Sequence, residues 1–366
     1  MKIVFIIDSI GSGGAQRLLI NIAKGLSKKY QTKIILYNQV SDIDSKEISE
    51  IFTKKLNSNQ LKGLSIKTIF KIREEIRDSN LLISFMPSSN IYCSISKLFL
   101  NNIYHIACEV STKNIAEGKL KRLIANFSNY FSNKIVCNTY MQADYIGKFP
   151  GMKNKVLTIW NGCENINFKQ RERRIKEDLK FIIVGRVAYP KNGFRFLKGL
   201  KLFYEKYKYL PFIKWIGRRD LSDKWNIEIN EKMDNFLKKH KYIAERFSFV
   251  GEKKNIINEY SKSDGIILPS IYEGLPYVIC EAMLNGTPIM ASKVGDNNII
   301  LGEKEERGIL FDPYSEKEIS EKLNIFISLK NKKIEKMTHN ARKFAEKHFM
   351  VENMLSSYEK IIDTLN

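Results

Sequence analysis

Hydrophobic residues along this chain fall into two alternating patterns, short continuous runs and longer stretches with a helical period. Continuous apolar runs between polar turns predict buried β-strands. These runs lie at residues 2–7, 33–37, 81–86, 103–107, 134–138, 156–160, 181–184, 212–216, 247–250, 265–268, 288–291 and 308–311. Amphipathic helices are predicted up to about residue 29, at 65–79, 90–100, 119–132, 192–208, 225–239 and 254–262, and from 315 onward. Strands that alternate with helices predict an α/β fold with parallel, doubly wound sheets.

One segment interrupts this alternation and predicts a domain boundary. Residues 169–178, KQRERRIKED, are dense in charge and poor in apolar side chains, which is typical of an exposed linker. A length of 366 residues also suits about two domains. We therefore expect an N-terminal domain over 1–168, a C-terminal domain over 179–349 and a last helix over 350–366.

The stretch from residue 265 to residue 288 carries the clearest local pattern. Its apolar run ends in a polar turn, and a helix is predicted to begin near Pro276, because proline fits the first helical turn. That helix should end at Gly286, since Pro288 follows just beyond and cannot continue a helix.

Two carboxylates in this stretch, Glu273 in the turn and Glu281 in the helix, can both face a ligand beyond the strand's carboxyl end. Open α/β sheets bind their ligands there. Taken alone, a Glu in a turn is usually a solvated residue. Glu281 stands among core-type residues such as Cys280 and Met283, where a carboxylate is costly unless it is paired or functional.

A glycine-rich loop follows the first predicted strand. The run Gly11-Ser-Gly-Gly14 lets the backbone approach a ligand closely. A dinucleotide site needs a third glycine, where this chain has Gln16, and an acidic residue about 20 positions further on, where the second strand ends in Tyr37. The loop therefore favours contact with a ligand, either the phosphate of a donor substrate or an acceptor substrate. A plain strand–helix turn stays open as an alternative.

Composition narrows the class of partner. The net charge of +21 is spread over both halves and fits a solvated basic surface or an anionic lipid surface. Because no zinc-finger, RNP or recognition-helix pattern is present, we expect no nucleic-acid partner. The five cysteines have no metal-ligand spacing and suit a reducing cytoplasm. No apolar run approaches the roughly 20 residues of a membrane span.

Several motifs together resemble a known family. In the C-terminal half they are Gly185-Arg186-Val-Ala-Tyr-Pro-Lys191, Pro269-Ser270, Glu273-Gly274 followed by Glu281, Gly286-Thr-Pro288 and Val294-Gly295. Their order and spacing resemble retaining, nucleotide-sugar-dependent glycosyltransferases of family 4. In the N-terminal half Gly13-Gly14-Ala-Gln-Arg17, Ile83-Ser-Phe85 and Asn161-Gly162 resemble bacterial members that build capsule, O-antigen or exopolysaccharide. The resemblance implies the GT-B fold, two Rossmann-like domains facing across a cleft, with helix 350–366 packing back on the N-terminal domain.

The resemblance also implies a donor site in the C-terminal domain. Arg186 and Lys191 would bind the donor diphosphate, assisted by the helix N-terminus after Gly274. Glu281 would bind the ribose hydroxyls, and Glu273 would bind the donor sugar or stabilise oxocarbenium-like charge. The predicted donor-binding set is Gly13, Gly14, Arg186, Lys191, Gly274, Leu275, Tyr277, Val278 and Glu281, and the predicted catalytic residues are Glu273, Arg186 and Lys191. No metal or other cofactor is expected to be required.

The candidate acceptor-binding residues are Arg17, Asn90 and Glu109. Many relatives carry a His near the end of the fourth N-terminal strand. Here His105 is expected inside the strand as a core or pairing residue, and Glu109 takes the place at its carboxyl end. Relatives usually carry a glycine pair followed by a Glu at the place of Gly295. Here Gly295 is followed by Asp296, so that Glu is absent.

The expected activity is transfer of a hexose or N-acetylhexosamine from a UDP-sugar to a lipid-linked saccharide. A GDP-mannose-dependent enzyme and a non-catalytic nucleotide-binding module stay open as alternatives. The basic amphipathic stretches 65–79 and 119–132 have flanks that could attract anionic lipid. We therefore expect a cytoplasmic protein, peripheral at the inner face of the cell membrane.

Overall fold

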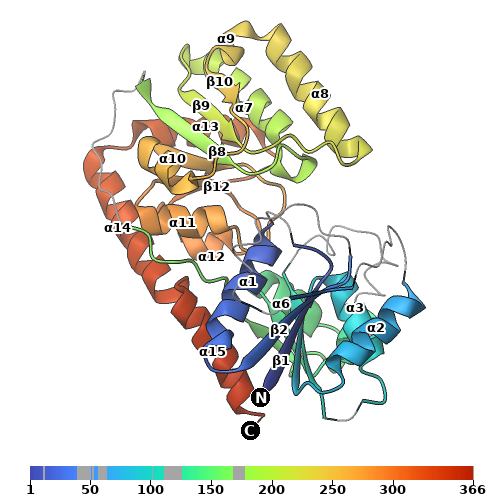
Figure 1. Ribbon diagram of the computed structural model, residues 1–366. Helices are drawn as coiled ribbons and strands as arrows, with labels where there is room; N and C mark the ends of the chain where they lie inside the picture. The colour runs from blue at the N-terminus through green and yellow to red at the C-terminus, as the bar shows by residue number, and fades with distance from the viewer. Residues whose placement is uncertain are drawn as a thin grey trace. The chain divides into compact units, whose positions relative to one another are not determined.

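The computed structural model describes residues 1–10, 13–38, 51, 53–56, 64–100, 102–110, 126–167 and 178–365 (Figure 1). These residues form two compact units, Met1–Gly162 with Val351–Asn366, and Cys163–Met350. The change of unit after Gly162 comes a few residues before the expected domain end at residue 168. Nearly all of the predicted linker, up to residue 177, lies outside the described residues.

The first unit holds a parallel sheet of seven strands in the order β3-β2-β1-β4-β5-β6-β7. The strands are β1 (Lys2–Ile7), β2 (Gln31–Leu36), β3 (Thr53–Lys55), β4 (Leu81–Phe85), β5 (Tyr104–Glu109), β6 (Lys134–Cys137) and β7 (Val156–Thr158). Successive side chains of β1 point to opposite faces, so Phe5 joins one core and Ile6 the other. A strand buried on both faces is a continuous apolar run, which explains the pattern of the sequence.

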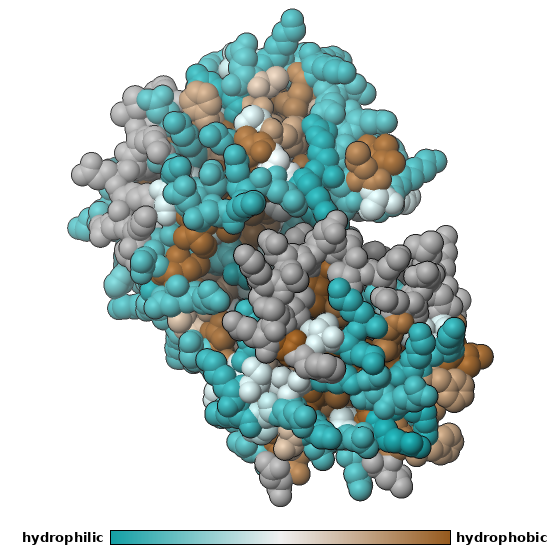
Figure 2. All heavy atoms as spheres, in the orientation of Figure 1, coloured by the Kyte–Doolittle hydropathy of each residue, from teal (hydrophilic) through white to brown (hydrophobic). Residues whose placement is uncertain are grey.

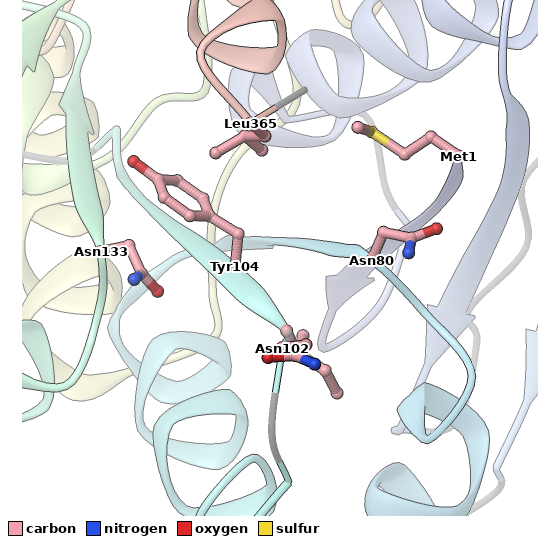
Figure 3. A pocket seen from close by; sticks show the side chains of 7 residues that line it. Met1, Asn80, Asn102, Tyr104, Asn133 and Leu365 are labelled. Carbon is pink, nitrogen blue, oxygen red and sulfur yellow. The ribbon is translucent and has the colours of Figure 1, made fainter.

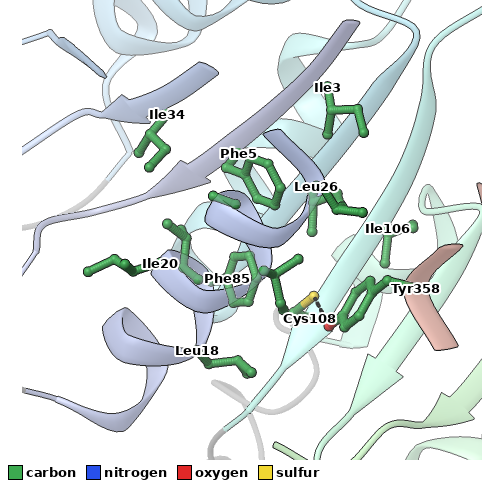
Figure 4. Close-up of a cluster of buried hydrophobic side chains, with 14 of the residues drawn as sticks. Ile3, Phe5, Leu18, Ile20, Leu26, Ile34, Phe85, Ile106, Cys108 and Tyr358 are labelled. Atoms are coloured by element: carbon green, nitrogen blue, oxygen red, sulfur yellow. Dashed lines mark hydrogen bonds between the residues drawn. The ribbon is translucent and has the colours of Figure 1, made fainter. Parts of the chain in front are cut away.

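Helices cover both faces of this sheet. On one face α1 (Gly14–Ser27) packs beside α15 (Val351–Asp363), the last helix of the chain. Figure 4 shows this core, in which Tyr358 of α15 reaches the thiol of Cys108 at 3.5 Å. Further helices in the described part of this unit include α2 (Ile66–Ile76), α3 (Pro87–Ser96) and α6 (Tyr140–Gly147). On the other face α2 contributes Ile72 and Ile76 to the second core.

The second unit holds a parallel sheet of six strands in the order β10-β9-β8-β11-β12-β13. The strands are β8 (Lys180–Val184), β9 (Phe212–Ile216), β10 (Phe247–Phe249), β11 (Gly265–Leu268), β12 (Ile289–Ser292) and β13 (Ile309–Phe311). The helices are η3 (Tyr189–Lys191), α7 (Gly193–Tyr207), α8 (Lys224–Lys239), α9 (Lys241–Ala244), α10 (Ile256–Lys262), α11 (Tyr277–Asn285), α12 (Asn297–Leu301), α13 (Glu316–Ser328) and α14 (Asn331–His348). Trp215, Phe196 and Phe326 are among its fully buried core residues.

The predicted fold class is confirmed, since both units are Rossmann-like α/β layers around a parallel sheet. The pattern missed the short elements β3, α9 and α12, each too short to show a period. The predicted helix at 119–132 lies partly outside the described residues, and 126–130 are helical. Of the helices in the described part of the chain, none combines the length and hydrophobicity that crossing a bilayer requires.

Strand order positions the candidate residues. In each sheet the chain starts at an inner strand, builds outward to one edge, and then returns to the other side of that strand. The reversal lies between β1 and β4 in the first unit and between β8 and β11 in the second. The loops after these strands diverge and leave room for a ligand, which is the usual binding position in open sheets.

Candidate functional site

The loops after β8 and β11 are tied together at the reversal point of the second sheet. The amide of Ile271 donates to the carbonyl of Pro190 at 2.9 Å. The side-chain amide of Asn192 donates to the carbonyls of Pro269 at 3.0 Å and Pro313 at 2.8 Å. Backbone and side-chain bonds therefore hold the two loops at a fixed separation.

Lys191 and Glu273 face each other across these loops. Their Nζ and Oε1 atoms lie 2.5 Å apart, and both side chains are largely buried. The hydroxyl of Ser270 donates to the same Oε1 at 2.6 Å. Because both donors use Oε1, the carboxylate is fixed in orientation and its Oε2 keeps its capacity to accept from a ligand hydroxyl. The structure thus brings two of the three predicted catalytic residues into contact.

Arg186, the third predicted catalytic residue, is more open. Its side chain is 57% exposed and donates through Nη1 to Asp220 Oδ2 at 2.6 Å. Burial alone would raise the pKa of Asp220, but hydrogen bonds from Ser222 and the charges of Arg186 and Arg218 lower it below its usual value. Asp220 is therefore ionised at neutral pH, and it holds the guanidinium beside the loop after β8.

Glycine allows the loops after β8 and β9 to touch through their backbones. Gly217 has a φ of +152°, and a Cβ built on it would lie 2.1 Å from the carbonyl oxygen of Gly185. The indole of Trp215 donates to that same oxygen at 2.8 Å. A side chain at Gly217 would push the Arg186 loop outward.

The turn into α11 is built as predicted. The helix begins at Tyr277 after Pro276 and ends at Gly286, which has a left-handed φ of +78°. Gly274 and Val278 are partly exposed, whereas the side chains of Leu275 and Tyr277 are buried. These two residues can therefore meet a donor only through their backbones, where the first N–H groups of the helix lack intrahelical partners.

Glu281 lies one to two turns into α11 and points into the protein. It is 3% exposed and accepts from the hydroxyl of Tyr260 at 2.8 Å. This hydrogen bond explains how a carboxylate is tolerated beside Cys280 and Ala282. Its predicted contact with a ribose stays a prediction.

In the first unit, the residues after β1 lie at the start of α1. Gly13 precedes the helix, Gly14 is its first residue and Arg17 is exposed in its first turn. The loop residues 11 and 12 lie outside the described part of the chain. The roles predicted for Gly13, Gly14 and Arg17 stay predictions.

Asn90 and Glu109 are in direct contact at the carboxyl ends of β4 and β5. The amide of Asn90 donates to Glu109 Oε1 at 2.9 Å, and Asn129 donates to the same oxygen at 3.4 Å. Asn90 is fully buried and Glu109 is 1% exposed. In this structure Asn90 therefore supports the carboxylate rather than presenting its own side chain at the surface. His105 lies inside β5 and is buried, as expected.

A cavity of about 560 Å³ opens at the opposite, amino-terminal edge of the first sheet (Figure 3). Its lining residues are Met1, Asn80, Asn102, Ile103, Tyr104, Asn133 and Leu365. None of the predicted site residues lines it. Among the described residues no group of three or more His, Cys, Asp or Glu side chains is arranged to hold a metal ion.

Several side chains that hold these residues had no role predicted from the sequence. They are Ser270 beside Glu273, Tyr260 beside Glu281, Asp220 beside Arg186, and Ser84 and Asn129 beside the Asn90–Glu109 pair. Ser270 and Ser84 stand in segments that the motifs already marked, and Asp220 follows the predicted strand at 212–216. Tyr260 and Asn129 carry no local signal, because only the packing of distant elements brings them to their partners.

Comparison with known proteins agrees with this geometry. Residues 165–344 match the family described as glycosyl transferases group 1. The chain is 24% identical, over 99% of its length and 98% of the relative's, to the GalNAc-alpha-(1->4)-GalNAc-alpha-(1->3)-diNAcBac-PP-undecaprenol alpha-1,4-N-acetyl-D-galactosaminyltransferase of Campylobacter jejuni. It is 22% identical, over 81% and 83% of the two lengths, to the capsular polysaccharide biosynthesis glycosyltransferase CapH of Staphylococcus aureus.

A solved structure shares the fold over the whole chain. Anabaena Alr3699/HepE, crystallised with UDP-glucose, superposes with a TM-score of 0.83 over 100% of both chains at 16% identity. The fold therefore extends through both units, in agreement with the expected GT-B class, and the family match covers most of the second unit. Residues 165–344 of this chain therefore form a domain that matches the glycosyl transferases group 1 family.

Proposed function

We propose that this glycosyltransferase is a retaining, metal-independent enzyme. It moves a hexose or N-acetylhexosamine from a UDP-sugar to a lipid-linked saccharide during synthesis of a bacterial surface polysaccharide. The observation that carries the proposal is the Lys191–Glu273 pair at the reversal point between β8 and β11, beside Arg186. It combines cations for a diphosphate with a carboxylate for a sugar on one sheet edge.

Departure of the donor diphosphate is the step that the cations assist. The leaving group carries about two negative charges, and it needs positive charge that is already in place. Arg186 can bind phosphate oxygens through its exposed fork while Asp220 keeps hold of Nη1. Lys191 supplies a second cation, and the amino end of α11 supplies N–H groups and a positive dipole end. These groups can perform the work that a metal ion would otherwise do.

Glu273 is placed for the donor sugar. Ser270 and Lys191 hold its Oε1, so a sugar hydroxyl would meet Oε2. The negative charge would also stabilise the oxocarbenium-like carbon that forms as the diphosphate leaves. Because the carboxylate does not need to reorient when that charge develops, its stabilisation acts on the transition state.

A UDP-sugar is favoured by the relatives. The Anabaena structure of the same fold holds UDP-glucose, and the Campylobacter relative is named for N-acetylgalactosamine transfer to a PP-undecaprenol-linked saccharide. The Staphylococcus relative is named for capsular polysaccharide biosynthesis. These names support UDP, an acetamido sugar or hexose, and a lipid-linked acceptor.

A lipid-linked acceptor requires contact with a membrane, and one surface of the first unit suits it. Ile66 and Phe70 lie one turn apart on the outer side of α2, 73% and 61% exposed, and Phe99 after α3 is 94% exposed. We call these three residues the apolar face. Figure 2 shows hydrophobic side chains at the surface over α2. Exposed apolar groups of this size commonly mark an interaction surface.

Hydrogen bonds tie α2 to the segment that carries Phe99, and basic residues lie close to the apolar face in the sequence. The hydroxyl of Ser96 donates to the carbonyl of Ile69 at 3.1 Å, and Arg73 donates to the carbonyl of Leu98. The flanking basic residues are Lys67, Lys71, Arg73 and Lys97. Aromatic side chains beside cations suit an anionic bilayer surface. We place the protein at the inner face of the cell membrane as a peripheral enzyme.

A thermal-shift panel of UDP-, GDP- and ADP-sugars tests the proposal, because a ligand that binds the native state raises its melting temperature. We expect UDP-sugars to give the largest shift. In a separate assay, the protein should transfer the sugar to a polyprenyl-diphosphate-linked N-acetylhexosamine. A larger shift with GDP-mannose would identify GDP-mannose, rather than a UDP-sugar, as the donor substrate. Binding without transfer or donor hydrolysis would favour a nucleotide-binding module without catalysis.

A further inference from the structure

Four polar side chains form a buried row that runs from the amino-terminal part of β5 to the carboxyl ends of β4 and β5. They are Ser84 of β4, Asn90 of α3, and His105 and Glu109 of β5, each no more than 1% exposed. The chain His105–Ser84–Asn90–Glu109 is connected by hydrogen bonds of 2.8, 2.6 and 2.9 Å. Glu109 is the carboxylate predicted to bind the acceptor substrate, whereas Ser84 and His105 have no role in the chemistry described so far.

The bonds in this row have a single consistent direction. Asn90 uses its Nδ2 to donate to Glu109, so its Oδ1 must accept, and it accepts from the Ser84 hydroxyl. A serine has one hydroxyl hydrogen, which is used in that bond. The contact between Ser84 and His105 must therefore be a donation from His105 Nε2–H to Ser84 Oγ. The imidazole is thus the neutral tautomer with its hydrogen on Nε2.

The other imidazole nitrogen shows that this histidine is not a simple packing residue. His105 Nδ1 is buried, and in the described part of the chain no group donates to it. Burial lowers the pKa of His105 to about 3, with a further contribution from the charge of Lys97. An aliphatic side chain between the apolar neighbours on β5 would avoid the cost of an unpaired buried nitrogen. A histidine at position 105 is better explained by the hydrogen bond that its Nε2–H donates to Ser84.

We propose that His105 and Ser84 are positioning residues for Glu109. The Nε2 hydrogen of His105 forces Ser84 to donate to Asn90, which fixes the Asn90 amide with its Nδ2 toward Glu109. The carboxylate is then held in one rotamer, where it can accept a hydrogen bond from an acceptor hydroxyl. This inference rests on the proposed function, in which Glu109 contacts the acceptor.

The row predicts what happens when its first member changes. With His105→Leu, Ser84 no longer receives a hydrogen bond from residue 105, and its hydroxyl is free to donate elsewhere. The Asn90 amide can then turn its oxygen toward Glu109, which repels the carboxylate. With His105→Gln, a side-chain N–H can replace the Nε2 donor, so this variant should rescue the orientation.

The kinetic experiment uses the full-length protein, UDP-N-acetylgalactosamine as donor, and a polyprenyl-diphosphate-linked N-acetylgalactosamine as acceptor. We expect His105→Leu to lower kcat/KM for the acceptor by at least about tenfold, because small misplacements of a reacting group are costly. The donor KM and the hydrolysis of donor by water should change less than about twofold. His105→Gln should recover most of the lost transfer.

A double-mutant cycle shows whether His105 acts through Glu109. In a Glu109→Gln background, His105→Leu should cause no further loss, since residues that act as a unit are not additive. Ile106→Val, in the same strand, is the control for a purely structural effect: it should lower stability and leave the acceptor KM unchanged. An equal loss from His105→Leu in both backgrounds, or the same kinetic change from Ile106→Val, would overturn the proposal.

An NMR experiment decides the inference even if the enzyme does not use this acceptor. Imidazole ¹⁵N shifts should show a neutral His105 with its hydrogen on Nε2 between pH 5 and 8. His105→Leu should move the side-chain amide signals of Asn90, and His105→Gln should leave them in place. The proposed direction of the hydrogen bonds would be refuted by a hydrogen on Nδ1 of His105. It would also be refuted if His105→Leu left the Asn90 amide signals unchanged. Absence of transfer by the wild type to any lipid-linked acceptor would instead count against the proposed function.

Discussion

The ammonium of Lys191 and the carboxylate of Glu273 lie 2.5 Å apart although 82 positions separate them in the sequence. They meet because β8 and β11 are neighbours in the sheet and their loops end at the same edge. The pair therefore couples the part of the site suited to a diphosphate with the part suited to a sugar. A change on either side should alter the other, and this coupling leads to the first two predictions.

Glu273→Gln should separate binding from turnover. Glutamine keeps the size of the side chain but removes its charge, so Lys191 loses its counter-ion and UDP affinity should stay the same or rise. Transfer should fall by about 100-fold or more, because a preorganised charge opposite developing positive charge is lost. Calorimetric titration with UDP and a steady-state transfer assay measure the two effects. Unchanged turnover would remove Glu273 from the catalytic residues.

Arg186→Ala should weaken binding of UDP much more than binding of uridine. The exposed guanidinium is suited to the diphosphate and has no reason to contact the nucleoside. We expect about a tenfold or larger loss for UDP and less than about a twofold loss for uridine. Arg246→Ala is the matched control, because Arg246 precedes β10, stacks over Phe212 at the amino-terminal ends of the strands, and should not affect UDP binding. Equal losses for the two ligands would exclude a diphosphate contact.

Replacing the apolar face should release the protein from anionic vesicles. The triple change Ile66→Ser, Phe70→Ser and Phe99→Ser removes exposed side chains whose burial in lipid is favourable. Co-sedimentation with phosphatidylglycerol-containing vesicles should weaken by about tenfold or more, and salt should weaken the wild-type interaction. Trp225→Ser, at a 70% exposed position of the second unit, is the control. Equal co-sedimentation of the triple variant and the wild type would exclude the apolar face as the membrane-binding surface.

The acid stability of the protein should depend on His105. Because burial lowers its native pKa to about 3, the native state stays unprotonated where the unfolded chain, with a pKa near 6.5, takes up a proton. This contribution to stability is present above about pH 6.5 and is lost as pH falls toward 3. Over that range, the unfolding free energy of the wild type, measured by chemical denaturation, should fall by up to about 1.4 kcal/mol per pH unit more than that of His105→Gln. Parallel pH profiles would contradict the burial of a neutral imidazole.

Gly217→Ala should destabilise the second unit and disturb the Arg186 loop. The added Cβ would meet the carbonyl oxygen of Gly185 at 2.1 Å, at a φ of +152° that suits glycine. We expect a loss of more than about 2 kcal/mol in unfolding free energy together with weaker UDP binding. Gly147→Ala is the control, since a Cβ there has no atom within 4 Å and alanine favours the helix. Similar effects from both changes would refute the close contact.

The apolar pattern predicted most strands closely because each strand is buried on both faces. Runs such as 212–216 and 265–268 coincide with β9 and β11. Short elements were missed for a local reason, since three residues of β3 or five of α12 show no period. The turn at Glu273 and the helix stop at Gly286 were predictable because glycine and proline act on their own backbone.

Contacts between distant elements could not be predicted in the same way. Asp220 holds Arg186, and Tyr260 satisfies Glu281, only because β9 and α10 pack beside the elements that carry those partners. The same holds for the contact between Asn90 and Glu109, whereas the acceptor-binding role of Asn90 stays a prediction. Rotamers and partners of this kind depend on side chains brought together by packing.

The local sequence pattern was enough to predict most of the segments that become strands and helices, and the glycine and proline residues that stand at their ends. Those properties follow from the periodicity of apolar side chains and from the backbone limits of glycine and proline, both of which act over a few residues. Only the tertiary structure decided that β8 lies beside β11, that Lys191 meets Glu273, and that a neutral His105 starts a row leading to Glu109. Strand order and buried hydrogen bonds depend on segments far apart in the chain, and their free energy is realised only when the whole sheet packs.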